Sequence, residues 1–328
     1  MRRAELVLFL ALATVASLAV ASDPSPASTG IGAFAGQVRS NDLVSLMRKL
    51  TGEDAVVTNR KPAFITTRHT GSGKPLRLAQ DFACAQFADA GLPVEVRGWS
   101  RGGYTNRNVL ATQTGLTRPQ EFVWFTAHLD VRNFEARVPG ADDNASGCAA
   151  VILAARVLSQ QRFARSIRYV LFTGEEQGGL GSAVEAGRAR QAGEQIVGVL
   201  NADMIAWDRR GEPVLRLVTR TNTSPDFPAD LRLATVVTNA IQAGGLSGEL
   251  VPVLTLTGNE ASDHASFWAQ GYPALLVTED FVRDGHFYYH TPKDDLARVN
   301  WKYLFATVRA LVASVAELAG PVTPTPDR

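Results

Sequence analysis

Continuous apolar runs alternate with helix-like segments along most of the chain. The runs at 122–127 and 167–172 are typical of buried strands, and an apolar helical segment at 147–158 lies between them. The same pattern predicts later strands at 196–204, 214–219, 251–256 and 273–278, and later helices at 179–189, 228–243, 264–270 and 301–318. Such alternation favours a mostly parallel sheet with helices on both faces.

The N-terminal part of the chain has shorter patterns. Helices are predicted at 38–51 and 75–90, and short strands at 94–97 and 107–112 around a Gly-rich loop. Residues 22–34 are rich in Ser, Pro and Gly and are expected to be flexible, and the Pro-rich tail 321–328 is expected to be disordered. Because no repeat or linker divides the remainder, residues 35–320 are expected to form a single domain.

The first 21 residues have the pattern of a secretory signal peptide. Arg2 and Arg3 precede an apolar run at 6–20, and Ala19-Val20-Ala21 is a small-x-small cleavage site. A membrane anchor is the alternative, but the run is short for a span and a polar segment follows it at once. The sequence therefore predicts a secreted or periplasmic protein with no stable membrane anchor.

Charge and cysteine content exclude several classes of function. The formal net charge is +1, and the charges balance once Arg2, Arg3 and Glu5 are removed with the signal peptide, so nothing favours nucleic acid as a partner. Cys84 and Cys148 are too few for a thiolate zinc site. Both lie in apolar helical segments, where free buried thiols are favoured over the disulfide that export would permit.

Candidate metal-binding residues follow the two central apolar runs. His128 and Asp130 come after the first run, and Glu175 and Glu176 come after the second. Because strand ends meet at one edge of an α/β sheet, these side chains are expected to form a site. A carboxylate two positions from a histidine can fix its ring, so Asp130 is expected to orient His128. Of the two glutamates, one could bind a metal while the other moves a proton.

Three more segments of the chain supply the remaining candidate metal ligands. Asp142, Asp143 and Asn144 precede a helix, where one of them is expected to act as its cap and the others remain available. Asp203 ends a buried strand, where an unpaired carboxylate is costly unless it binds a metal. His290 is favoured over His286, because a Thr-Pro turn follows it.

The donor set indicates two metal ions. Two histidines and several carboxylates without a thiolate suit zinc in a nitrogen and oxygen environment. Five ligands are more than a single catalytic zinc takes, and they suit two ions that share one carboxylate. The HExxH motif, the Walker loop and the serine nucleophile elbow are absent from the sequence.

These motifs resemble those of the secreted bacterial zinc aminopeptidases, which are relatives of glutamate carboxypeptidase and glutaminyl cyclase. The matching segments are AHLD, PGADDNASG, TGEEQGGLGS, NADM, SDHASFWAQGYPA and YYHTPKDDL, in the family's order and spacing. The resemblance covers residues 65–315 approximately and implies a three-layer α/β/α sandwich with a mixed sheet of about eight strands. It makes residues 35–320 a single metallopeptidase catalytic domain.

The resemblance also implies a role for each matched residue. One zinc ion would be held by His128, Asp143 and Asp203, and the other by Asp143, Glu176 and His290. Glu175 would be general base and acid for a hydroxide that bridges the two ions and attacks peptides with a free N-terminus. Tyr289 matches a tyrosine with which one branch assists the oxyanion, whereas the loop LTGNEAS lacks the cysteine and tyrosine of another branch.

Three other functions stay open at this point. A glutaminyl cyclase shares the scaffold and most ligands but uses one zinc ion. A carboxypeptidase or dipeptidase needs cations for a substrate carboxylate, for which Arg216 and Arg220 are candidates. A non-catalytic binding domain would be expected to have lost ligands, and here every ligand position is filled.

Overall fold

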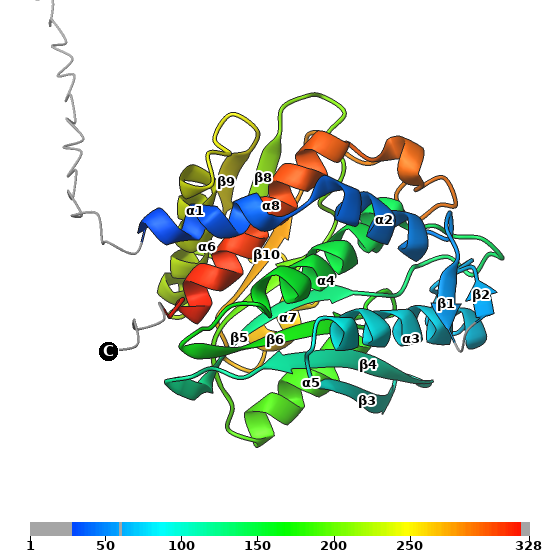
Figure 1. Cartoon of the computed structure of the whole chain (residues 1–328), viewed down its shortest axis with the longest axis horizontal. Helices are drawn as coiled ribbons and strands as arrows, with labels where there is room; N and C mark the ends of the chain where they lie inside the picture. The colour runs from blue at the N-terminus through cyan, green and yellow to red at the C-terminus, as the bar shows by residue number, and fades with distance from the viewer. Residues whose placement is uncertain (1–27, 59–60, 323–328) are drawn as a thin grey trace, which may run out of the picture.

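The computed structural model describes residues 28–58 and 61–322 (Figure 1). Within these residues the chain forms an eight-stranded mixed sheet in the order β3-β4-β6-β5-β7-β10-β8-β9. The neighbours β6, β5, β7 and β10 run parallel, whereas β3, β4 and β8 pair antiparallel with β4, β6 and β10 respectively. The strands are β3 (Val94–Arg101), β4 (Tyr104–Gln113), β5 (Arg118–His128), β6 (Arg165–Phe172), β7 (Gln195–Ala202), β8 (Val214–Val218), β9 (Val251–Thr255) and β10 (Ala274–Thr278).

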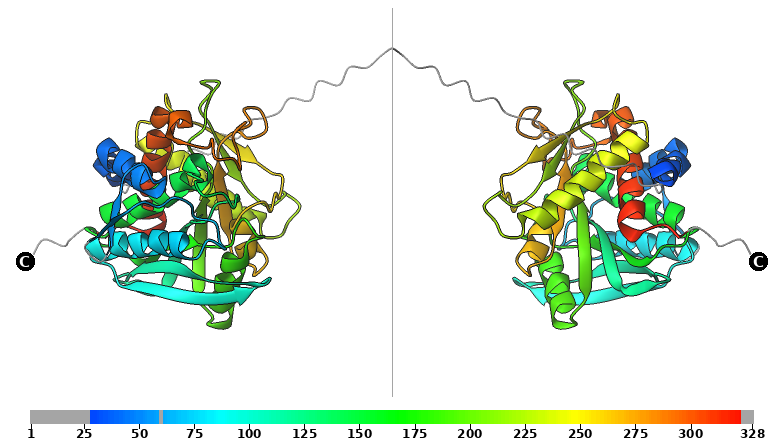
Figure 2. Two further views of the ribbon diagram at one scale, coloured as in Figure 1. Left: turned by 90° about the vertical axis from the view of Figure 1, so that its right-hand side faces the viewer. Right: turned by 90° about the vertical axis from the view of Figure 1, so that its left-hand side faces the viewer.

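Helices cover both faces of the sheet. The left view of Figure 2 shows the N-terminal helices and the C-terminal helix on one side of it. The helices are α1 (Ser28–Gln37), α2 (Ser40–Leu50), α3 (Lys74–Asp89), α4 (Gly147–Leu158), α5 (Leu180–Gln191), α6 (Phe227–Ala243), α7 (His264–Trp268) and α8 (Trp301–Ala319). Residues of α5 and α7 pack on the opposite face from the other helices. This arrangement confirms the expected three-layer α/β/α sandwich with a mostly parallel sheet.

Strand β5 shows why the central strands are continuously apolar. Successive side chains of a strand point to opposite faces. Val123 and Phe125 pack in the larger core beneath the helices on one face, whereas Trp124 points to the other face and meets Phe267 of α7 at a centroid distance of 5.2 Å. Because helices cover both faces, both sets of side chains must be apolar, and the strand reads as an unbroken run rather than an alternation.

The structure differs from the expectations near the N-terminus. Ser28–Gln37, within and just after the segment expected to be flexible, form helix α1. Ile31 and Ala35 of this helix pack with Ala240 of α6 and Ala313 of α8, and this tertiary packing stabilises a helix that its Gly-rich sequence alone disfavours. A two-stranded hairpin of β1 (Val56–Thr58) and β2 (Lys61–Ala63) was not expected either.

Several sequence-based expectations fall at or beyond the edges of the described chain. The signal peptide at 1–21 and the tail residues 323–328 lie outside the described residues. Where the tail begins, Val322 donates its N–H to the Arg162 carbonyl at 2.9 Å.

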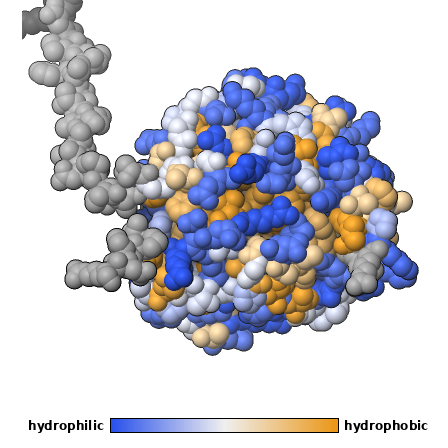
Figure 3. Space-filling model, in the orientation of Figure 1, coloured by the Kyte–Doolittle hydropathy of each residue, from blue (hydrophilic) through white to orange (hydrophobic). Residues whose placement is uncertain are grey.

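Cys84 and Cys148 are both free, as expected. Among the described helices, none is long and apolar enough to cross a membrane. Figure 3 shows the surface in the orientation of Figure 1. Hydrophilic residues predominate on this side, and patches of hydrophobic residues lie between them.

Candidate metal centre

The sheet brings the five expected ligands together at one edge. His128 is the last residue of β5, Asp203 follows β7 directly, and Glu176 follows β6 after a short turn. Because these three strands are parallel neighbours, their carboxyl ends deliver the three side chains to one place. Asp143 comes from η1 (Ala141–Ser146), a distorted segment that leads into α4, and His290 comes from the loop after β10.

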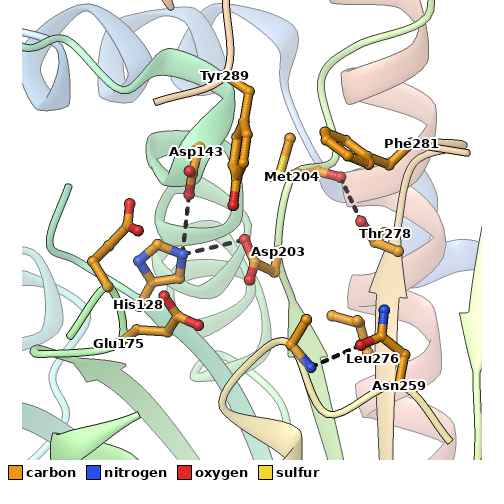
Figure 4. Close-up of a pocket in the computed structure, with 12 residues that line it drawn as sticks. His128, Asp143, Glu175, Asp203, Met204, Asn259, Leu276, Thr278, Phe281 and Tyr289 are labelled. Carbon is orange, nitrogen blue, oxygen red and sulfur yellow. Dashed lines mark hydrogen bonds and ion pairs between the residues drawn. The ribbon is translucent and has the colours of Figure 1, made fainter. Parts of the chain in front are cut away.

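The Asp143 carboxylate lies between two groups of ligands. Its Oδ1 is 3.2 Å from Nε2 of His128, which also lies 3.2 Å from Oδ1 of Asp203. Its Oδ2 is 3.2 Å from Nε2 of His290, which lies 2.9 Å from Oε2 of Glu176. In each group the ligand atoms are within 4.8 Å of one another. Figure 4 shows the first group around His128.

The chemistry of these groups fits two cations. Burial and, to a smaller extent, the charge of Asp143 raise the pKa of Glu176 to about 7. Among the described residues, the buried Oε1 of Glu176 has no hydrogen-bond partner. Buried carboxylates at such close range repel one another unless positive charge lies between them. The donor set of imidazole nitrogens and carboxylate oxygens is that of zinc, and the shared Asp143 suits a pair of ions.

Backbone contacts fix the position of Asp143. The Asp294 carboxylate accepts the N–H groups of Asp142 and Asp143 at 2.9 and 3.0 Å. Asn144, as expected for one of the three residues before the helix, accepts the Gly147 N–H at the start of α4 at 2.9 Å. Nothing in the local sequence around Asp294 shows that its side chain reaches a segment so far back in the chain.

Asp203 is oriented by a short series of buried hydrogen bonds. The Ser262 hydroxyl donates to its Oδ2 at 2.6 Å, which leaves Oδ1 facing His128. Ser262 in turn accepts from Asn201 at 2.8 Å, and the Asn201 amide oxygen accepts from Thr126 at 2.7 Å. Ser262 was seen in the sequence only as part of a matching motif, since its partner is distant along the chain.

Asp130 has a different contact from the one expected. Nδ1 of His128 is 3.2 Å from the backbone oxygen of Asp130 but 3.8 Å from its carboxylate. The carboxylate instead accepts the N–H groups of Glu175 and Glu176 at 3.3 and 3.2 Å, and the Thr70 hydroxyl at 2.9 Å. Because Asp130 lies beyond the end of β5, its side chain faces the turn after the neighbouring β6. It therefore orients the two glutamates more directly than it orients His128.

Arg68 is a further positioning residue that the sequence did not indicate. Its side chain is fully buried, and it donates to the carbonyl groups of Leu129, Pro139 and Gly140 at 2.7, 2.6 and 2.9 Å. It thus joins the segment after His128 to the segment before η1. A single arginine in a polar stretch has no periodicity that would mark it, so only the tertiary structure shows this role.

The remaining histidines stay outside the two ligand groups. His286 was expected on the loop surface, but it is only 4% exposed and packs edge-on against Trp207 at 4.2 Å, and burial lowers its pKa to about 4. His264, which was expected to be structural, is fully buried with Nε2 2.8 Å from the Asn259 carbonyl. Burial also lowers the pKa of His264 to about 4, so the ring is neutral and Nε2 donates.

Glu175 and Tyr289 face the cavity that the ligands enclose. Burial raises the pKa of Glu175 well above its ordinary value, and the carboxylate belongs to neither ligand group. The Tyr289 ring stacks on His290 at a centroid distance of 3.5 Å, and Figure 4 shows its hydroxyl between Asp143 and Asp203. The cavity has a volume of about 230 Å³. On its other side it is lined by Met204, Asn259, Ala261, Leu276, Thr278 and Phe281.

Comparison with known proteins places the chain in a family. Residues 108–315 match the family model described as "Peptidase family M28". Leucine aminopeptidase 1 of Trichophyton equinum is 30% identical over 236 residues, which cover 67% of this chain and 60% of that protein. A probable zinc metalloprotease of Pyrenophora tritici-repentis is 26% identical over 289 residues, covering 74% of this chain and 60% of the relative. The chain thus spans about 60% of the length of the curated relatives it matches.

Solved structures share the fold at lower sequence identity. The LapA aminopeptidase of Legionella pneumophila superposes with a TM-score of 0.71 at 20% identity, covering 89% of this chain and 75% of that one. The glutaminyl cyclase of Porphyromonas gingivalis superposes with a TM-score of 0.66 at 19% identity, covering 85% and 98%. The family match extends over the ligand-bearing strands and the loop that carries His290. This chain belongs to peptidase family M28.

Proposed function

We propose that the protein is an aminopeptidase that removes the N-terminal residue of peptides with the help of two zinc ions. The observation that carries this proposal is the position of the Asp143 carboxylate between two groups of residues. One of its oxygens faces the group with His128, and the other faces the group with His290. His128 and Asp203 would hold one ion, Glu176 and His290 the other, and Asp143 both. The names of the curated relatives support the aminopeptidase reaction for the same family.

The residues of the chain divide the work of hydrolysis between them. When bound, the two zinc ions would supply Lewis acidity and make a water molecule acidic near neutral pH. Glu175 would accept the proton of the attacking water and give it to the leaving amine. Its raised pKa favours the second of these transfers. Asp130 holds the backbone of Glu175 and Glu176, so that one glutamate is kept for the proton and the other for the metal.

Tyr289 would stabilise the negative charge that develops on the carbonyl oxygen. Burial raises the pKa of its hydroxyl, so the group stays protonated and can donate a hydrogen bond. Its stacking on His290 fixes the ring against one ligand group. The same stacking leaves the hydroxyl in the cavity, where Figure 4 shows it.

The surroundings of the two candidate arginines argue against a carboxypeptidase. Arg216 pairs with Asp280 at 2.6 Å, and Arg220 pairs with Asp230 at 2.8 Å. Neither lines the cavity, and no Lys or Arg is found among the described residues that do. A substrate carboxylate would have no cationic side chain to bind there, whereas a free N-terminus meets carboxylates.

Peptide products from the zinc-loaded protein test the reaction. We expect mass spectrometry to show stepwise loss of residues from the free N-terminus, no loss when the N-terminus is acetylated, and no effect of amidating the C-terminus. Loss from the C-terminus would contradict the proposal and favour a carboxypeptidase. A peptide that begins with Gln separates the cyclase, because cyclisation releases ammonia and leaves the chain length unchanged.

We also propose that the protein is exported to the periplasm or the medium, which rests on the sequence pattern of residues 1–21 alone. The N-terminal mass of the mature protein, isolated from each cell fraction, tests this proposal. We expect a chain that begins after Ala21, found outside the cytoplasm. A full-length chain retained in the cytoplasm would contradict it.

A further inference from the structure

The wall of the cavity opposite the metal ligands combines apolar and polar side chains. Met204, Ala261, Leu276 and Phe281 give it apolar surface, and the side chains of Asn259 and Thr278 are its polar groups. Figure 4 shows Met204, Asn259, Leu276, Thr278 and Phe281 across the cavity from His128 and Glu175. They come from the ends of β7 and β10 and from the loop between β9 and α7. An aminopeptidase must place the side chain of the first residue beside the reacting carbonyl, and this wall is the surface available to it.

Asn259 offers a hydrogen-bond donor to this space. Its Oδ1 accepts the Ala261 N–H at 3.0 Å, which identifies the oxygen; within residues 28–58 and 61–322 its Nδ2 amide group has no partner and can donate to a ligand. The backbone carbonyl of Asn259 accepts from the buried His264 at 2.8 Å, so the loop is fixed on the protein side. Figure 4 shows the amide nitrogen on the side of the residue that faces Thr278.

Thr278 offers the matching acceptor. Its hydroxyl donates to the Met204 carbonyl at 3.2 Å, and that bond uses its only hydrogen. The Glu279 N–H donates to the same carbonyl at 2.9 Å, which holds Met204 against the end of β10. The remaining lone pairs of Thr278 can accept a hydrogen bond. The wall therefore presents one donor and one acceptor, and no ionisable side chain.

We propose that Asn259 and Thr278 recognise the end of the N-terminal side chain and admit glutamine besides neutral apolar residues. This inference rests on the proposed aminopeptidase function. The side-chain amide of glutamine has one acceptor for Asn259 and one donor for Thr278, while its methylene groups lie on the apolar part of the wall. Glutamate has the same shape but lacks the donor, and it carries a charge that no cation on the wall compensates.

The isosteric pair of N-terminal glutamine and glutamate provides the test. We expect kcat/KM of the zinc-loaded protein for a glutamine dipeptide to be within about tenfold of that for the leucine dipeptide, and about 100-fold above that for the glutamate dipeptide. Thr278→Val removes the acceptor at equal volume and should lower the glutamine-to-leucine ratio about fivefold. Thr235→Val is the control, since this exposed threonine also donates to a carbonyl, that of Leu231, but lies on α6 away from the cavity.

A variant that introduces a negative charge makes the test independent of lost activity. Asn259→Asp keeps an oxygen for the Ala261 N–H but replaces the amide donor with a carboxylate. We expect the ratio of lysine to leucine dipeptide hydrolysis to rise about tenfold, because the new charge attracts the ammonium group. All specificities are ratios measured within one variant, so a general loss of activity does not enter them.

The outcomes distinguish the proposed side-chain recognition from the proposed aminopeptidase activity on which it rests. If leucine is released but the glutamine-to-leucine and lysine-to-leucine ratios stay at wild-type values in both variants, the assignment of Asn259 and Thr278 is wrong and the aminopeptidase stands. Equal hydrolysis of glutamine and glutamate dipeptides by the wild type would also overturn it. If the wild type hydrolyses none of the dipeptides, the proposed function itself fails.

Discussion

At the scale of single residues, Asp143 is the one that the two candidate ligand groups share. Its two oxygens are each 3.2 Å from a different histidine, so it contributes to both ligand groups. Asp203 contributes only to the group with His128, and Glu176 only to the group with His290. Variants of these acids should therefore differ in the number of ions that they lose, and not only in activity.

Zinc content can be measured on the purified variants after dialysis. We expect about two zinc ions per chain for the wild type, about one for Asp203→Asn, and close to none for Asp143→Asn, because the shared ligand is lost from both groups. The exposed Asp226, which pairs with Arg220 on the surface, provides the control as Asp226→Asn. One zinc ion in the wild type, or equal losses from both variants, would contradict the shared site.

Glu175 is the residue on which the chemical step is expected to depend. Glu175→Gln keeps the shape of the side chain but removes its ability to carry a proton. We expect kcat for leucyl-anilide to fall by about 10²–10⁴-fold while zinc content and Tm remain those of the wild type. Glu317→Gln is the matched control, since Glu317 is also partly buried with a raised pKa but lies on α8. Wild-type kcat in Glu175→Gln would show that another group moves the proton.

The five residues of the two candidate ligand groups could be predicted from the sequence, whereas the residues that hold them in place could not. Ligands are strongly polar residues at the ends of apolar runs, and that contrast is visible in one dimension. Thr70, Asp294 and Ser262 reach the site through contacts with residues far along the chain. The carboxylate of Asp130 was assigned to His128 because they are two positions apart, but it faces the neighbouring strand turn instead.

At the scale of secondary-structure elements, burial decided which predictions were accurate. Strand β10 and helix α4 lie in the core, where every buried position is apolar and the pattern is complete. The edge strand β3 and its neighbour β4 extend beyond the predicted 94–97 and 107–112, because the exposed parts of this hairpin have no apolar pattern. Helix α1 was missed because its stability comes from packing on α6 and α8 rather than from its own residues.

The start of α4 must lie very close to β7 for Asp143 to reach the site. A Cβ atom at Gly147 would collide with the backbone oxygen of Ala202 and with the side chain of Asn144. We expect Gly147→Ala to lower the free energy of unfolding by about 1–3 kcal/mol, and to weaken zinc binding because η1 would shift. Urea unfolding and zinc titration measure the two effects.

Gly187 of α5 is the matched control for that substitution. A Cβ atom there would meet nothing within 4 Å. Gly187→Ala should therefore raise the free energy of unfolding by up to about 1 kcal/mol, since alanine favours a helix. Equal effects of the two substitutions would mean that the approach of α4 to β7 does not constrain Gly147.

At the scale of the whole molecule, the metal-free protein should lose stability as the pH rises. Burial raises the pKa of Glu176 from 4.5 to about 7. The folded state therefore favours the protonated carboxyl group, and the stability that this group contributes at low pH is lost as the pH rises through 7. Burial alone would lower the pKa of His290, but hydrogen bonds to Asp143 and Glu176 raise it to about 9, and the stability this gives is lost as the pH rises through 9. Both changes have the same sign.

The measurement is Tm of the chelator-treated protein from pH 6.5 to 9, with and without zinc. His264 and His286, whose pKa values are lowered to about 4, contribute stability that is lost only as the pH falls below about 6.5, so they do not affect this range. We expect Tm of the metal-free protein to fall steadily across the range. Bound zinc should remove that decrease, because it stabilises ionised carboxylates and neutral imidazoles. A Tm of the metal-free protein that stays constant over this pH range would contradict the prediction. It would mean that the buried carboxylates do not need a nearby positive charge to offset the cost of their burial.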